Sequence, residues 1–260
     1  MDSKYHIENK KNQNRTIDLA IFMGQSNMAG RGDSFEAPMV SKGHGYEFRA
    51  ISDPTKLYDI VEPFGVNENN DYGISEPEMK TGSLISSFVI SYYKVTDIPL
   101  VCISASKGGS SISKWKPNGN YLNDSVNRLK EAKKYLINNG YIIRRKFMVW
   151  CQGETDGDHN MSELEYKEKF KAIVEEMIGN GIEKCFLICI GNHRDLPKQY
   201  MSIIKAQIDF CKESENVVLV STQFKKMAEL GLMKDSFHYK QIAYNMVGTE
   251  AGNNVGLYNK

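Results

Sequence analysis

A serine near the start of the chain and a histidine near its end could act together in acyl transfer. Ser26 follows an apolar run at residues 17–23, and His238 closes the sequence DSFH. A serine hydroxyl is a weak nucleophile that needs an adjacent base, and a histidine base needs an acceptor that fixes its tautomer. The two candidates for that acceptor are Asp235, three residues before the histidine, and Glu154, in the sequence QGETD. The residue types do not decide between them, so both are kept as candidate catalytic residues.

Acyl transfer also needs hydrogen-bond donors for the oxyanion that develops in the transition state, and loss of one such donor typically costs about 3 kcal/mol. The adjacent glycines Gly108 and Gly109 could offer backbone N–H groups, because no side chain obstructs a ligand there. The backbone N–H of Ser26 and the side-chain amide of Gln152 are further candidates. We therefore expect these four residues to form an oxyanion hole.

Five short apolar runs are expected to form the strands that carry these residues. The runs are rich in Val, Ile, Leu and Phe and do not alternate cleanly with polar residues, which is typical of strands buried on both faces of a parallel sheet. Apolar residues at helical spacing lie between the runs, so strands and helices alternate as in a doubly wound α/β fold. The expected strands cover residues 17–23, 99–104, 146–151, 184–190 and 216–221, and the expected helices lie around residues 84–92, 122–136, 166–177, 200–211 and 241–251.

The candidate residues follow the ends of the expected strands or lie in a late loop. Ligands of open α/β sheets bind beyond the carboxyl ends of the strands, so these segments are expected to meet at one edge of the sheet. The chain shows no internal repeat and no low-complexity linker, which predicts a single domain over residues 16–260 after a polar arm over residues 1–15. A long polar stretch over residues 53–80, rich in Pro and Gly, is interpreted as a loop insertion on the substrate side.

Four sequence blocks resemble those of the SGNH-hydrolase superfamily. They are GQSNMAG at residues 24–30, GGSSI with Trp115 at residues 108–115, WCQGETD at residues 150–156 and DSFH at residues 235–238. More narrowly, the blocks are similar to those of the sialate O-acetylesterase-like proteins and of the acetylxylan esterases of carbohydrate esterase family six. They come in the order of that family and extend over most of the chain.

The resemblance implies a three-layer α/β/α, flavodoxin-like fold with a central parallel sheet, and metal-independent deacetylation of a sugar ester. Position by position, it implies that Ser26 is the nucleophile, His238 the base and Asp235 its partner, with Gln152 and the glycine pair as oxyanion donors. In this family the glutamate of QGE could share or take the partner's role, so Glu154 stays beside Asp235. No cofactor and no metal ion is expected.

Several residues in or near the blocks are predicted to contact the substrate. Trp115 is interpreted either as a wall against which a sugar ring stacks or as an aromatic residue of the core. Position 151 is Cys where many xylan-active relatives have His, and we expect this difference to affect specificity. The predicted substrate contacts are Gln25, Asn27, Arg31, Trp115, His193 and Arg194.

The composition narrows the classes of partner. The chain of 260 residues has 33 Lys and Arg against 32 Asp and Glu, a formal charge of +1, so electrostatics gives no reason to expect nucleic acid or an anionic membrane as partner. No apolar run approaches the roughly 18 residues of a membrane span. The five cysteines lie in apolar runs and are predicted to be buried free thiols.

The first residues, MDSKYHIENKKNQNR, contain no apolar core of signal-peptide length. This favours a cytoplasmic location, whereas a secreted chain from which a signal segment had been removed would look the same. The resemblance predicts a serine esterase that removes O-acetyl groups from an acetylated carbohydrate, of the acetylxylan or sialate type. The alternatives are an esterase of the same fold acting on lipid or other small esters, and a non-catalytic carbohydrate-binding protein. The glycan and the oligomeric state are left open.

Overall fold

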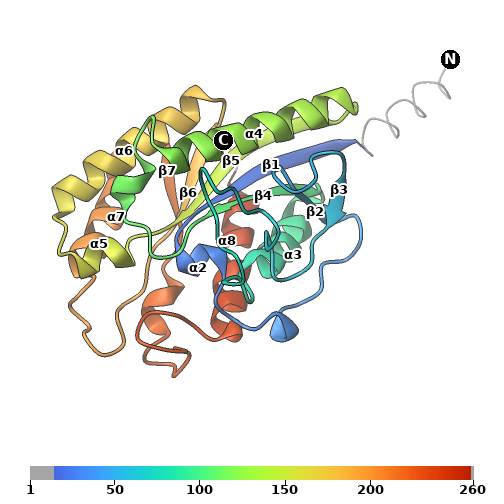
Figure 1. Ribbon diagram of the computed structural model, residues 1–260. Helices are drawn as coiled ribbons and strands as arrows, with labels where there is room; N and C mark the ends of the chain where they lie inside the picture. The colour runs from blue at the N-terminus through green and yellow to red at the C-terminus, as the bar shows by residue number, and fades with distance from the viewer. Residues whose placement is uncertain (1–14, 259–260) are drawn as a thin grey trace, which may run out of the picture.

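The computed structural model describes residues 15–258, in which seven strands form one sheet (Figure 1). The strands are β1 (Thr16–Gly24), β2 (Gly45–Phe48), β3 (Leu57–Asp59), β4 (Leu100–Ser106), β5 (Ile142–Cys151), β6 (Lys184–Ile188) and β7 (Val217–Ser221). Their order in the sheet is β3-β2-β4-β1-β5-β6-β7. All neighbours pair in parallel except β2 and β3, which pair antiparallel. The predicted α/β fold class with a central parallel sheet is confirmed, except that β3 runs antiparallel to its neighbour.

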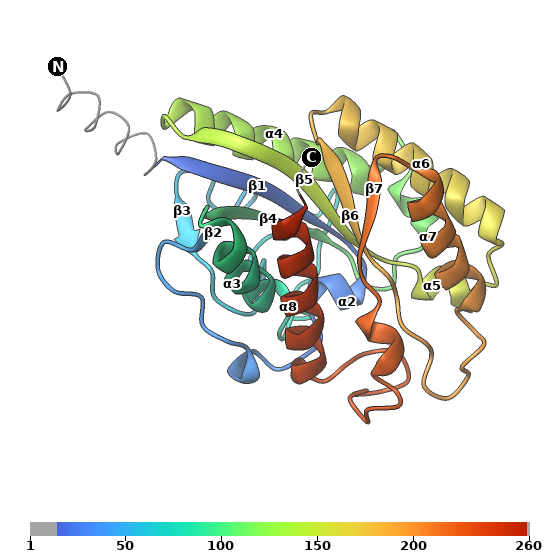
Figure 2. The same cartoon turned by 180° about the vertical axis from the view of Figure 1, so that it is seen from behind.

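Helices cover both faces of the sheet, which gives three layers (Figures 1 and 2). One face carries α3 (Ile85–Thr96) and α8 (Gln241–Leu257), and the other carries α4 (Asn120–Asn138), α6 (Glu163–Gly179) and α7 (Met201–Glu213). Successive residues of a strand point to opposite faces, and β1 supplies both cores in this way. Leu19, Ile21 and Met23 pack with α4, α6 and α7, whereas Ala20 and Phe22 pack with α3 and α8. The apolar runs lack alternation because both faces are buried.

The register of the central strands brings three of the sequence blocks to one edge of the sheet. Gly24, the last residue of β1, pairs with Ser106 at the end of β4 and with Cys151 at the end of β5. The segments that follow these strands therefore start side by side. The loop before α8 brings the fourth block to the same region, as its contacts with Ser26 show.

Several short elements were not expected from the sequence. Strands β2 and β3 form an antiparallel pair at one edge of the sheet, and β3 lies inside the stretch of residues 53–80 that was expected to be irregular. Neither strand exceeds four residues, so neither forms an apolar run that the pattern could reveal. The other short elements are α2 (Ser26–Ala29), α5 (Glu154–Asp158), and the 3-10 helices η1 (Ser34–Glu36), η2 (Ile112–Trp115) and η3 (Gln223–Lys226).

A buried arginine fastens residues 53–80 to the body of the domain. Arg128 of α4 is 1% exposed, and its guanidinium donates to the carbonyl groups of Ser104, Glu68 and Ile74. It also pairs with Asp124, whose carboxylate accepts the N–H of Ile74. A buried charge with this many partners is costly to disrupt. The stretch is therefore held against α4 and the end of β4, next to the edge where the sequence blocks meet.

The five cysteines are free, as predicted. Four of them are buried and Cys211 is half-buried. None of the helices within residues 15–258 combines the length and the apolar character needed to cross a membrane. The polar arm predicted over residues 1–15 lies outside the described residues, apart from Arg15.

Candidate active site

Two glycines shape the turn that presents Ser26. Gly24 has a φ of 140°, and a Cβ there would lie 1.9 Å from the carbonyl oxygen of Cys151. Gly30 has a φ of 93°, and a Cβ there would lie 2.5 Å from the carbonyl oxygen of Gly82. No other residue type fits such a backbone without strain. The block GQSNMAG therefore begins and ends with glycine because β1, β5 and residue 82 approach this turn so closely.

The structure brings Ser26, His238 and Asp235 into one hydrogen-bonded chain. His238 Nε2 lies 3.0 Å from Ser26 Oγ, and His238 Nδ1 lies 2.8 Å from Asp235 Oδ2. Asp235 Oδ1 accepts the backbone N–H groups of Phe237 and His238, so the short turn itself orients the carboxylate. Ser26 is 6% exposed and the His238 side chain 17%, so the site is recessed yet open to a small ligand. These three residues, the triad, have the types and contacts that a nucleophile, a base and an orienting acid require.

Burial and neighbouring charges set the protonation states of the pair. Burial lowers the pKa of His238 below the usual 6.5, and it outweighs the hydrogen bond and charge of Asp235, which act to raise that pKa. The positive charges of Arg31 and Lys234 lower it further. Burial acts to raise the pKa of Asp235, but hydrogen bonds from two backbone N–H groups and from the imidazole hold it below its usual value. At neutral pH the imidazole is thus neutral and the carboxylate ionised, as a general base requires.

Glu154 does not contact His238, which corrects its prediction as a candidate orienting acid. The carboxyl is 3% exposed, and its Oε1 accepts from Asn27 Nδ2 at 2.5 Å. Its Oε2 has no hydrogen-bond partner among the residues that the structure describes. Because Asp235 already occupies His238 Nδ1, no place on the imidazole remains for a second acid.

Two of the four predicted oxyanion donors are committed elsewhere. The N–H of Gly108 donates to Glu76 Oε1 at 2.7 Å. Gln152 is fully buried, and its Nε2 has two hydrogens for three acceptors within 3.2 Å, on Gln25, Ser110 and Asp156. These contacts contradict a donor role for Gly108 and Gln152.

The backbone N–H groups of Ser26 and Gly109 stay available as donors. Within residues 15–258 neither of them donates to a protein acceptor. Gly109 is exposed and has a φ of 63°, and nothing lies within 4 Å of where a Cβ would be, so its backbone is accessible to a ligand. Within residues 15–258, no group of three or more His, Cys, Asp or Glu side chains is placed to hold a metal ion.

A buried glutamate, Glu76, holds the glycine loop formed by Gly108 and Gly109. Glu76 is 3% exposed, and its carboxylate pairs with Arg31 and Lys107 as well as with the N–H of Gly108. Burial acts to raise its pKa, but the two cations hold it below the usual value. Glu76 lies in the stretch of residues 53–80, so this stretch contacts the loop of Gly108. The sequence marks the stretch by its irregularity but does not distinguish this acid from the others in it.

Three of the predicted substrate contacts are internal supports. Trp115 is fully buried, packs on Trp150 and Tyr121, and donates from its indole N–H to Ser110 Oγ. It is therefore a core residue, and the interpretation of Trp115 as a wall for a sugar ring is wrong. Asn27 is fully buried, and both its amide nitrogen and its amide oxygen form hydrogen bonds within the protein.

Gln25, 3% exposed, accepts the N–H groups of Gly153 and Thr155 and thereby joins the ends of β1 and β5. Cys151 is also fully buried, in the core under α3 and α8, which argues against a direct effect of this residue on specificity.

The other three predicted contacts lie around the triad. Arg31 is close enough to lower the pKa of His238, although its guanidinium is paired with Glu76. His193 is half-buried, with its ring beside that of Phe237. Arg194 is exposed, pairs with Asp195 and donates its backbone N–H to Ser236. A contact between substrate and any of these three stays a prediction.

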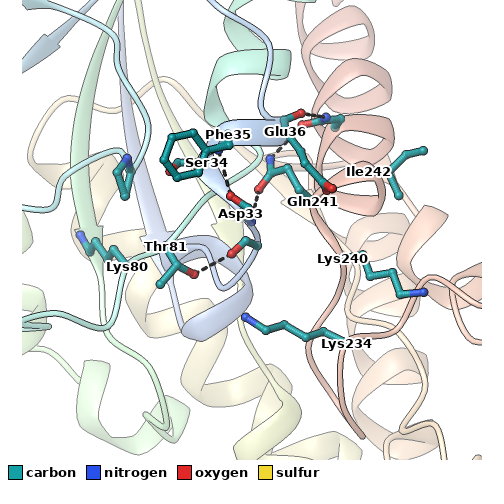
Figure 3. Close-up of a pocket in the computed structure, with 13 residues that line it drawn as sticks. Asp33, Ser34, Phe35, Glu36, Lys80, Thr81, Lys234, Lys240, Gln241 and Ile242 are labelled. Atoms are coloured by element: carbon teal, nitrogen blue, oxygen red, sulfur yellow. Dashed lines mark hydrogen bonds between the residues drawn. The ribbon is translucent and has the colours of Figure 1, made fainter.

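A cavity of about 920 Å³ lies next to this region, at the start of α8 (Figure 3). Ser26 and His238 are not among its lining residues. Lys234 links it to the site, because this residue lines the cavity and donates from its Nζ to the carbonyl oxygen of Arg31. The cavity therefore lies beside the triad. Its walls come from residues 32–36, 63, 80–81, 234, 240–242 and 245.

Comparison of the sequence with family models finds one match that spans nearly the whole chain. Residues 16–255 match the family SASA, described as carbohydrate esterase, sialic acid-specific acetylesterase. Comparison with curated proteins finds no match.

Solved structures share the fold at low sequence identity. A protein from Arabidopsis thaliana has a TM-score of 0.71 at 17% identity, over 94% of this chain and 99% of that one. NanS has a TM-score of 0.64 at 13% identity, over 94% of this chain and 97% of that one. A carbohydrate acetylesterase from Xanthomonas citri has a TM-score of 0.57 at 13% identity, over 90% of this chain and 55% of that one. At these identities the likeness shows the fold.

Proposed function

The chain belongs to the carbohydrate esterase family of sialic acid-specific acetylesterases, and we propose from this premise that it is a serine esterase that removes O-acetyl groups from carbohydrates. The observation that carries the proposal is the chain of hydrogen bonds from Ser26 Oγ through His238 to Asp235, at 3.0 and 2.8 Å. A nucleophile and base within hydrogen-bond reach, with the base oriented by a third group, is the arrangement that covalent catalysis uses.

The first half of the reaction forms an acetyl-enzyme. Ser26 Oγ attacks the acetyl carbonyl carbon while His238 Nε2 takes the hydroxyl proton, and Asp235 stabilises the imidazolium that results. The backbone N–H groups of Ser26 and Gly109 donate to the oxyanion. The C–O bond to the sugar then breaks, and His238 returns the proton to the sugar oxygen.

The second half repeats these steps with water. His238 takes a proton from a water molecule, whose oxygen attacks the acetyl carbon on Ser26. The tetrahedral intermediate collapses, Ser26 Oγ regains its proton from His238, and acetate leaves. Each proton travels through one imidazole, so the neutral form of His238 at neutral pH is the form that begins both halves.

A panel of esters tests the proposal and its alternatives. We expect acetate release from O-acetylated sugars, with acetylated sialic acid, acetylated xylan and small acetylated sugars measured side by side, and much slower hydrolysis of long-chain esters. A preference for long acyl chains would instead support the lipid-esterase alternative. Binding of an acetylated sugar without acetate release would support the carbohydrate-binding alternative. Ser26→Ala run on the same panel separates enzymatic release from spontaneous hydrolysis.

The role of Asp235 has its own test. We expect Asp235→Asn to lower kcat/KM by about 10²- to 10³-fold, less than the roughly 10⁴-fold known for a buried aspartate, because the Asp235 side chain is 46% exposed. An asparagine keeps the acceptor for the backbone N–H groups, but its Nδ2 can only donate to His238 Nδ1. The imidazole proton then moves to Nε2, where it faces Ser26 Oγ and prevents proton transfer.

A neighbouring aspartate provides the control for this variant. Asp195 bonds to Ser236 and Arg194 and is not hydrogen-bonded to His238. Asp195→Asn is expected to change kcat/KM by less than about threefold. If Asp235→Asn were as active as Asp195→Asn in the steady-state assay, Asp235 would not be the orienting acid.

A further inference from the structure

A buried hydrogen-bonded group lies behind the triad. It consists of Asn27, Glu154 and Tyr244, each at most 3% exposed. Asn27 Nδ2 donates to Glu154 Oε1 at 2.5 Å and to the carbonyl oxygen of Phe237 at 3.0 Å, while Asn27 Oδ1 accepts from Tyr244 OH at 2.7 Å. Both hydrogens of the amide nitrogen are thus used, which fixes the orientation of the side chain.

Asn27 connects the two segments that carry the triad. It follows Ser26 directly in α2, and Phe237, whose carbonyl it holds, directly precedes His238. These segments are 210 residues apart in the sequence. The side chain of Asn27 is therefore a direct tie between the nucleophile's turn and the base's turn, in addition to the Ser26–His238 hydrogen bond itself.

The carboxyl of Glu154 is unusual for a buried acid. Asn27 is the one side chain that bonds to it, and its Oε2 is buried without a partner among the described residues. Burial raises the pKa of Glu154 to about 7. A buried polar atom with no partner costs stability, so an acid in this place needs a reason other than stability. Its position next to the triad indicates what that reason is.

We propose that Glu154 is a positioning residue of the reaction, which fixes the amide of Asn27 so that Asn27 holds the His238 turn at the distance from Ser26 that proton transfer needs. Without an acceptor at position 154, one hydrogen of the buried Asn27 amide loses its partner, and the side chain is held only by Phe237 and Tyr244. Asn27 then holds the His238 turn less firmly against the turn of Ser26. The inference rests on the proposed function, since it concerns the rate of the reaction that Ser26 and His238 carry out.

A pair of variants at position 154 tests the acceptor. Glu154→Ala removes it, and we expect kcat to fall by about 10- to 100-fold, since small misplacements of reacting groups cost rates of this order. KM is expected to stay within about twofold, because Glu154 is buried and bonds to Asn27 rather than facing solvent. Glu154→Gln keeps an acceptor oxygen for Asn27 and imitates the neutral acid, so its kcat is expected to stay within about threefold of wild type.

A pair of Tyr→Phe variants tests the other side of Asn27 with a matched control. Tyr244→Phe removes the hydrogen bond to Asn27 Oδ1 and is expected to lower kcat, as Glu154→Ala does. Tyr92 is equally buried, but its hydroxyl donates to Asp18, toward the opposite end of β1 from the site. Tyr92→Phe loses a comparable buried hydrogen bond and is expected to leave kcat unchanged. This pair keeps the test available if Glu154→Ala does not fold.

The outcomes distinguish this inference from the proposed function. If wild type and Ser26→Ala release acetate at the same rate, the proposed function fails. If Ser26→Ala is inactive while folded Glu154→Ala keeps full kcat, or Tyr244→Phe matches Tyr92→Phe, the positioning role is overturned. It is also overturned if Glu154→Gln loses as much activity as Glu154→Ala, or if KM rather than kcat carries the change.

Discussion

Ser26→Ala is expected to lower kcat/KM for an acetylated sugar by at least about 10⁴-fold, which corresponds to roughly 5.5 kcal/mol of transition-state stabilisation. The variant retains the backbone N–H of residue 26 and the N–H of Gly109, so the oxyanion donors survive. It lacks the oxygen that forms the covalent intermediate, so water must attack the ester directly. Acetate release followed over time gives the rate, and mass spectrometry of the acid-quenched wild type is expected to show one acetyl group on Ser26 during turnover.

A second buried serine provides the control for Ser26→Ala. Ser87 of α3 is 4% exposed, similar to Ser26 at 6%, and its hydroxyl bonds to Asn245 rather than to the triad. Ser87→Ala loses one buried hydroxyl in the same way and is expected to keep wild-type kcat/KM within about threefold. Equal rates for Ser26→Ala and Ser87→Ala would show that Ser26 is not the nucleophile.

The main elements of the fold could be predicted because its strands are buried on both faces. Continuous apolar runs such as those of β1 and β4 are distinctive, and the helices between them keep a regular apolar face. The antiparallel pair β2–β3 could not be predicted in this way. Its strands have only three or four residues, and β2 is placed by pairing with β4 rather than by a pattern of its own.

The approach of His238 to Ser26 could also be predicted, because one block follows a strand end, the other lies in a late loop, and the two are expected to meet at one edge of the sheet. The choice between Asp235 and Glu154 could not, since both belong to blocks that converge on the site. The structure distinguishes them by contact: Asp235 bonds to His238, whereas Glu154 bonds to Asn27.

The surroundings of the triad were the least predictable part of the site. Gln152, Asn27 and Trp115 were predicted to face the ligand because they lie in the blocks, yet all three are fully buried. Polar residues at the edge of a sheet can turn inward wherever buried backbone groups need partners. A sequence gives the position of an amide along the chain but not the direction in which it points. For the same reason Glu76, which holds the glycine loop, has no motif of its own.

His238→Ala is expected to cost about as much as Ser26→Ala, roughly 10⁴-fold or more in kcat/KM, because a hydroxyl without a base is a poor nucleophile. In wild type the rate should fall as the pH drops through the pKa of His238, since only the neutral imidazole accepts the proton. Burial lowers that pKa, so this acid limb is expected below pH 6.5. The residual rate of His238→Ala should lack the limb, whereas His44→Ala, at a ring that stacks on Tyr93, should keep it.

Two further measurements decide whether His238 acts as the base for Ser26 or merely supports the fold. The His238 side chain is 17% exposed, so its removal leaves a space that solvent reaches, and added imidazole is expected to restore part of the rate in His238→Ala but none in Ser26→Ala. The double variant is expected to be no slower than either single variant, because the two residues perform one step together. Losses that multiplied in the double variant would mean that Ser26 and His238 contribute independently, which a shared proton transfer does not allow.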